Sequence, residues 1–248
     1  MTRVDAILAE SNAAWRTFIR RRTAVVFTFV FPLLLVIIFG ALVSTDPGDG
    51  GLFTEPPVYY VPGYLAVVVM FTPLSRMGAE VTRHRDAHRF EKLATTPLSN
   101  TGWLLAHTIV TIILVGIASL IILIALWLLA GVQVIPGPGL GLFIIVGVAM
   151  FCGIGACLGR LAETQDGVIA LSNTIALPML FLAETFVPVD MLPSWFSPIV
   201  SVMPLTPFTR GVRAVIAGDA SWILELGILA VLAIAFLYIG ARAIPTTD

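Results

Sequence analysis

The chain has 248 residues, of which 58% are hydrophobic and only 12% charged, and its mean hydropathy is +0.99. Soluble domains carry roughly 25% charged residues, so this composition excludes an ordinary water-soluble fold. The formal net charge of −1 gives nucleic-acid binding no electrostatic support. Cys152 and Cys157 lie in one apolar stretch, which indicates small hydrophobic side chains and not a disulfide framework or metal site.

Residues 1–22 have an amphipathic pattern at helical spacing. The apolar side chains that share one face are Val4, Ile7, Leu8, Trp15, Phe18 and Ile19, with Arg16 and Arg20 outside it. This pattern predicts a helix that lies in the membrane interface. The alternative is a short disordered lead with anchoring arginines.

Six apolar segments follow that reach or approach the roughly 20 residues that a spanning helix needs. They are Thr23–Val43, Tyr59–Ser75, Leu104–Gly131, Leu140–Gly159, Val168–Ala183 and Ile223–Gly240. A cleaved signal peptide is the competing interpretation of the first segment. Its apolar run is longer than a typical signal-peptide core, and no A-x-A pattern follows, so an uncleaved span is favoured.

The basic residues are distributed unevenly among the loops. Of the fourteen Lys and Arg residues, all but Arg210 and Arg213 fall on one side of the predicted spans. The positive-inside rule places that side in the cytoplasm. We therefore predict a multi-pass protein of the cytoplasmic (plasma) membrane with both termini in the cytoplasm.

The segment 80–100 is the densest polar region of the chain. His84 and His88 are four residues apart, a spacing that can bind zinc on a helix. The motif H-R-D-A-H lacks the Glu of zinc proteases, and the remaining histidine, His107, lies inside a span, so no metal site is predicted. Proline at position 97 ends a helix, and Ser99 or Asn100 can cap the next one. A short surface helix is expected here, with a solvated loop as the alternative.

The segment Glu184–Asp219 faces the outer side but stays apolar. It contains five prolines, Pro188, Pro193, Pro198, Pro204 and Pro207, together with Phe186, Trp195, Phe196 and Phe208. Prolines at this spacing prevent one continuous span, so helices that enter the outer leaflet and return are predicted. Glu184 begins this region. It is either a functional acid near the membrane or a solvated interfacial side chain.

Enzyme chemistry has little support in the sequence. There is no G-x-x-x-x-G-K-[ST] phosphate loop, no G-x-S-x-G motif and no convincing pair of acids. An ion-coupled secondary transporter would need ionisable residues at mid-bilayer, and only His107 and Glu225 lie within the predicted spans. A non-transporting scaffold that recruits an ATPase stays open.

Two segments resemble the permease subunits of type-2 ABC exporters. The first follows a pattern like R-E-x-x-x-G-T-x-E-x-L-x-x-T-P, matched by Arg83, Glu91, Leu93, Thr96 and Pro97, with departures at His84, His88 and Arg89. The second follows F-x-P-x-x-x-L-P-x-W and then P-L-T, matched by Phe186, Pro188, Leu192, Pro193, Trp195, Pro204, Leu205 and Thr206. Arg213 resembles the arginine that often follows these segments.

The resemblance implies an all-α integral membrane domain over residues 1–248. It would have six spans, an interfacial helix (1–22), a coupling-helix region (80–100) and an outer re-entrant region (184–221). Two such chains, identical or homologous, would join two ABC subunits that bind ATP and Mg²⁺, so this chain would be a transport subunit without its own ATPase site or cofactor. Spans two and five would line the passage.

The resemblance also assigns residues to these regions. The ATPase-coupling residues would be Glu80, Arg83, Arg85, Glu91, Leu93, Thr96 and Pro97. The outer gate would contain Glu184, Phe186, Pro188, Leu192, Pro193, Trp195, Pro204 and Arg213. The expected substrate is an amphiphilic drug, lipid or related compound, which the complex would export or flip.

Overall fold

The computed structural model describes residues 2–43, 55–186 and 194–244, and every regular element within these ranges is a helix. The α-helices are α1 (Arg3–Arg20), α2 (Arg22–Val43), α3 (Val61–Asp86), α4 (Arg89–Ala94), α5 (Asn100–Ala130), α6 (Pro138–Leu161), α7 (Gln165–Leu182), α8 (Ser197–Val202), α9 (Thr206–Ala217) and α10 (Trp222–Ala243). Two 3-10 turns, η1 (Pro57–Tyr60) and η3 (Ser194–Phe196), precede α3 and α8. The six apolar segments of the sequence overlap, in chain order, with α2, α3, α5, α6, α7 and α10.

Five helices of the described chain are long and apolar enough to cross a bilayer: α3 together with η1, α5, α6, α7 and α10. A sixth candidate is the pair of α1 and α2, which is bent by 90° between Arg20 and Arg22. The predicted all-helical, multi-pass membrane architecture is therefore confirmed, with five to six candidate spans.

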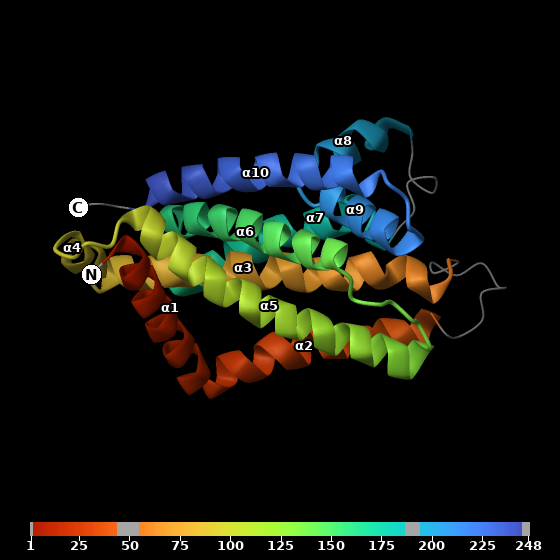
Figure 1. The fold of residues 1–248 in the computed structure, drawn as a ribbon, viewed down its shortest axis with the longest axis horizontal. Coiled ribbons are helices and arrows are strands. Elements are labelled where there is room, and N and C mark those ends of the chain that lie inside the picture. Colours follow the sequence, from red (N-terminus) through yellow and green to blue (C-terminus); the bar gives the residue numbers. More distant parts are fainter. Residues whose placement is uncertain (1, 44–54, 187–193, 245–248) are drawn as a thin grey trace.

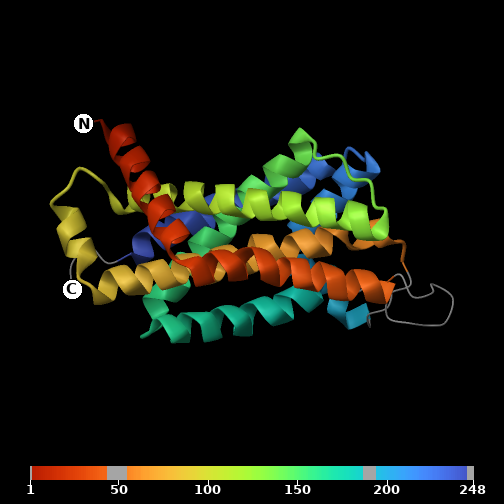
Figure 2. The same ribbon diagram turned by 90° about the horizontal axis from the view of Figure 1, so that it is seen from below.

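The long helices run side by side along the long axis of the molecule (Figures 1 and 2). The start of α1, the short helix α4 and the C-terminal end of α10 lie at one end of this bundle, which we call the α4 end. Helices α8 and α9 lie at the opposite end, the α9 end. Helix α1 does not follow the bundle axis but slants across the α4 end of α5.

Helix α3 forms the centre of the bundle. Over an apolar stretch of 18 residues, 72% of the segment formed by η1 and α3 is buried inside the chain, compared with only 17% of α10. Small residues let α6 approach α3 closely: a Cβ added to Gly155 would lie 2.8 Å from the Leu74 carbonyl oxygen, and one added to Gly159 would lie 2.5 Å from the Gly78 carbonyl oxygen. Close packing through small residues is the usual way in which membrane helices associate.

Helix α3 extends beyond the segment that hydropathy predicts. The predicted span ends at Ser75, before the first charge at Arg76, whereas the helix continues to Asp86. The extension is stable because its charges have partners. Arg76 Nη1 donates to the Thr111 hydroxyl at 2.5 Å and lies 5.6 Å from the centre of the Phe18 ring. Within the predicted surface segment 80–100, α4 alone is a separate short helix.

Candidate functional site

The turn between α3 and α4 places a short helix at the end of the bundle. His88 adopts a left-handed conformation (φ 48°), which ends the path of α3 and redirects the chain into α4. The Phe90 side chain is 5% exposed, and its ring centre lies 5.2 Å from that of Trp103 and 5.5 Å from that of His84. Glu91 and Lys92 are exposed. Phe90 thus attaches α4 to the bundle, while the charged side chains face outward.

Hydroxyl groups then complete the turn from α4 into α5. The Thr95 and Thr96 hydroxyls donate to the carbonyl oxygens of Lys92 and Leu93, each at 2.7 Å. Ser99 caps α5, because its hydroxyl oxygen accepts the Gly102 amide at 3.1 Å. This is the capping role that the sequence predicts for Ser99 or Asn100.

Helix α1 covers the other side of this end of the bundle. Thr2 and Asp5 form a capping box at its start, and the Ser11 hydroxyl contacts the Ala106 carbonyl oxygen of α5 at 3.3 Å. One face of α1 packs on the bundle through buried residues, including Ala14 and Phe18. A cavity of about 460 Å³ lies between α1, α3, α4 and α5, and basic side chains are prominent in its lining.

A cluster of charged side chains lies at the α9 end of the bundle. Glu184 is buried and has a positive φ of 56°. Its carboxylate accepts hydrogen bonds from the Arg210 guanidinium, with Arg210 Nε at 3.0 Å, and its carbonyl oxygen accepts one from Arg213 Nη2 at 2.9 Å. The hydrogen bond to Glu184 raises the pKa of Arg210 above its usual value. Arg213 also lies over the Tyr59 ring, 4.2 Å from its centre. Glu184 is therefore paired inside the protein and is not a solvated interfacial acid.

Comparison of the whole sequence with known protein families identifies the family of this chain. The family model described as ABC-2 type transporter matches residues 6–217, a range that includes α4 and the ion-paired residues Glu184 and Arg210. The chain belongs to this family. As an ABC-2 permease, it is a multi-pass transporter subunit of a kind that associates with an ABC ATP-binding subunit.

The chain is also similar to individual proteins that are named as permeases. The chain is 25% identical over 230 residues to the daunorubicin resistance ABC transporter permease protein DrrB1 of Streptomyces coeruleorubidus, covering 89% of this chain and 79% of the relative. It is 24% identical over 211 residues to the putative transport permease ycf38 of Cyanophora paradoxa, covering 82% and 71%. The same protein of Porphyra purpurea is 23% identical over 199 residues, covering 78% and 68%.

The structure separates the predicted coupling residues of this permease into two groups. Glu91, Thr96 and Pro97 are exposed around α4, and Leu93 is partly buried. The others face the bundle: Glu80 is buried and ion-paired with Arg83, and Arg85 Nη2 donates to the Glu163 carbonyl oxygen at 2.9 Å. Arg85 thereby joins the end of α3 to the turn between α6 and α7.

The residues predicted to form the outer gate differ in their exposure. Phe186 is buried near Tyr64, with ring centres 5.9 Å apart, whereas Trp195 is 64% exposed. Pro204 is partly buried just before α9. Pro188, Leu192 and Pro193 lie outside the described residues.

Several residues that sequence reasoning did not select occupy central positions. Arg210 donates two hydrogen bonds to the Glu184 carboxylate. The sequence marks Arg210 as one of two basic residues on the side opposite the other twelve. Gly155 and Gly159 form a G-x-x-x-G pattern that is visible in the sequence and mediates the contact with α3. Nothing in the sequence indicated that Phe90, which lies in a charged segment, would be buried.

We expect Phe90→Ala to loosen α4 while leaving the rest of the bundle folded. Removal of a buried phenylalanine costs about 3 kcal/mol, and here the loss falls on one short helix. Hydrogen exchange should therefore become faster at the amides of residues 89–96, with little change in α6. Glu91→Ala, an exposed change on the same helix, is the control. Unchanged exchange in Phe90→Ala would show that Phe90 does not hold α4.

Proposed function

We propose that this chain is the permease subunit of an ATP-driven exporter, and that α4 is the element through which a separate ATP-binding subunit drives it. This proposal rests on the way in which α4 is attached to the bundle and exposed. It is a short helix attached by one buried aromatic ring, with Glu91 and Lys92 exposed, at the end of the most deeply buried span. A short, charged helix of this kind suits docking of a soluble protein.

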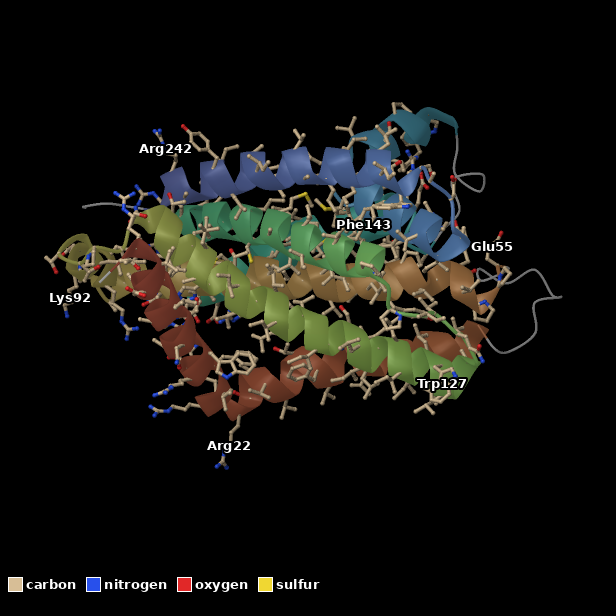
Figure 3. The ribbon with its side chains drawn as sticks, in the orientation of Figure 1. Arg22, Glu55, Lys92, Trp127, Phe143 and Arg242 are labelled. Carbon is tan, nitrogen blue, oxygen red and sulfur yellow. The ribbon has the colours of Figure 1, made fainter. Side chains whose placement is uncertain are left out.

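The proposed topology puts the α4 end in the cytoplasm. Lys92 and Arg242 lie toward this end, and Glu55 and Trp127 lie at the other (Figure 3). An excess of basic residues marks the cytoplasmic side of a membrane protein. In this arrangement residues 1–22 form an interfacial helix in the plasma membrane, residues 80–100 form the coupling region, and both termini are cytoplasmic.

The outer region 184–221 is then a re-entrant segment that gates the exit. Support comes from α8 and α9, which are too short to span a bilayer, and from the contacts that join Glu184 to Arg210 and Arg213. The complex would contain two permease chains, identical or homologous, and two ATP-binding subunits carrying ATP and Mg²⁺. Its substrate would be an amphiphilic drug, lipid or related compound.

Co-purification with an ABC ATP-binding subunit tests the docking role. We expect the double variant Glu91→Ala/Lys92→Ala to weaken association about tenfold, which corresponds to about 1.4 kcal/mol, because it removes two exposed charges from the proposed contact. The matched control is Arg160→Ala/Glu163→Ala, which also removes one base and one acid from exposed positions. Equal association of both variants would contradict docking through α4.

Transport in proteoliposomes separates an exporter from the other classes. The complex should move an amphiphilic substrate only with a catalytically active ATP-binding subunit. Transport that continues with an inactive ATP-binding subunit would indicate an ion-coupled carrier. A folded complex without transport or substrate-stimulated ATP hydrolysis would indicate a scaffold.

A further inference from the structure

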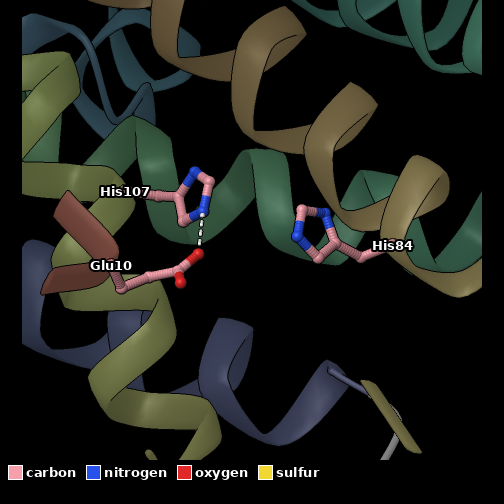
Figure 4. A group of neighbouring side chains, drawn as sticks. All are labelled: Glu10, His84 and His107. Atoms are coloured by element: carbon pink, nitrogen blue, oxygen red, sulfur yellow. Dashed lines mark hydrogen bonds and ion pairs between the residues drawn. The ribbon is translucent and has the colours of Figure 1, made fainter. Parts of the chain in front are cut away.

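Three side chains from separate helices converge at the α4 end of the bundle. Glu10 comes from α1, His84 from α3 and His107 from α5, and one ligand atom of each lies within 4.8 Å of the other two. Figure 4 shows both imidazole rings and the carboxylate directed toward one another. The spacing of His84 and His88 in the sequence makes them a possible zinc-binding pair. His88 does not join this cluster in the structure, because its side chain is exposed and Nδ1 lies 3.0 Å from Glu91 Oε1.

The hydrogen bonds around His84 leave one ring nitrogen directed at this cluster. His84 Nδ1 lies 2.9 Å from the Glu80 carbonyl oxygen, and a carbonyl oxygen can only accept, so Nδ1 carries the proton. Nε2 therefore keeps its lone pair. A backbone carbonyl that fixes the tautomer of a histidine in this way is the usual outer-shell partner of a metal ligand.

His107 is deeply buried and its hydrogen bonding is incomplete. The side chain is 97% buried and its ring centre lies 4.3 Å from that of Trp103, which also contacts His84. Nε2 lies 3.2 Å from Glu10 Oε1, while Nδ1 has no hydrogen-bond partner among the described residues. The imidazoles of His84 and His107 thus lie next to each other, and not all of their ring nitrogens have a hydrogen-bond partner among the described residues.

We propose that Glu10, His84 and His107 bind a divalent transition metal of the zinc class. Two imidazoles and one carboxylate form a ligand set that zinc accepts, with a remaining position for water. Tetrahedral coordination at 2.0–2.1 Å needs ligand atoms roughly 3.3 Å apart, so binding draws the three side chains together by about 1 Å. Glu10 can make this movement because its side chain is flexible and α1 lies at the surface.

Two of the neighbouring basic side chains have their charge paired or screened. Arg83 is ion-paired with Glu80, and Arg89 is exposed to solvent, which screens its charge. A bound ion would join α1 to α3 and α5 beside α4. The site would thereby stiffen the part of the protein to which α4 is attached.

Cobalt binding tests this site without any need for transport activity. The protein, purified on a tag that contains no histidine and stripped with a chelator, is titrated with Co²⁺ while its visible absorption is recorded. We expect one Co²⁺ per chain in the wild type and at least about tenfold weaker binding in Glu10→Gln, His84→Gln and His107→Gln.

Two variants control for other ligands. His88→Gln removes a histidine four residues from His84, and Cys157→Ser removes a partly exposed thiol, so both should bind Co²⁺ as the wild type does. Absence of stoichiometric binding in the monodisperse wild type overturns the proposal by itself, even where a ligand variant fails to fold. Unchanged affinity in all three ligand variants, or loss in His88→Gln, overturns it as well.

Discussion

Replacing Gly159 with alanine is expected to lower the free energy of unfolding by about 2 kcal/mol, because the added methyl group overpacks a backbone contact. Its Cβ would lie 2.5 Å from the Gly78 carbonyl oxygen and 2.7 Å from Val81 Cβ. The obstacle at Gly78 is backbone and cannot rotate away, so α3 and α6 must separate. Separation also weakens the hydrogen bond from the Thr82 hydroxyl to the Gly159 carbonyl oxygen, which measures 3.1 Å.

Gly141→Ala provides the matched control on the same helix. Apart from its chain neighbours and the backbone of its own helix, no heavy atom of the described residues lies within 4 Å of a Cβ at this position. The change should therefore be neutral or stabilising by up to about 1 kcal/mol. Chemical unfolding in detergent micelles compares the two variants. Equal stabilities would show that α3 and α6 do not pack through their small residues.

Replacing Glu184 with glutamine is the second change with a large expected effect. The shape and the backbone conformation are kept, but Arg210 and Arg213 lose their shared anion. Loss of one partner of a buried ion pair costs about 3–5 kcal/mol. Because the Arg210 side chain is 39% exposed, solvent screening reduces the expected loss to about 1–2 kcal/mol.

A double-mutant cycle with Arg210→Gln isolates this interaction. The two single changes should each destabilise the protein, and the double variant should cost less than their sum. Additive effects would show that Glu184 and Arg210 do not interact in the membrane. Under the proposed function, Glu184→Gln should also weaken the coupling of ATP hydrolysis to substrate movement, measured as molecules moved per ATP.

The sequence predicted the long helices well because hydropathy acts over the whole length of a span. The apolar run Leu104–Gly131 corresponds to α5 within a few residues. Prediction was poorer where charge occurs inside a helix. Arg76 ended the predicted second span, but a hydroxyl on α5 satisfies its guanidinium, and that partner is distant in the sequence.

The side-chain clusters were harder to foresee than the helices. His107 was set aside as a residue inside a span, yet the start of α5 lies level with the end of α3, so His107 meets His84. Glu184 could equally have been solvated, because nothing local indicates that Arg210 reaches back across the turn. Such contacts depend on how helices are staggered, and periodicity within one helix carries no information about stagger.

The central position of α3 has a mechanical consequence. At 1.5 Å per residue its 26 residues extend about 39 Å, from η1 and the region of Tyr64 to the start of α4. A helix resists stretching, so a displacement of α4 reaches the far end as translation or tilt. Pro73 lacks an amide donor near the middle, which makes it the place where α3 bends most easily. The resistance of α3 to bending at Pro73 therefore determines how much of a push on α4 arrives at Phe186.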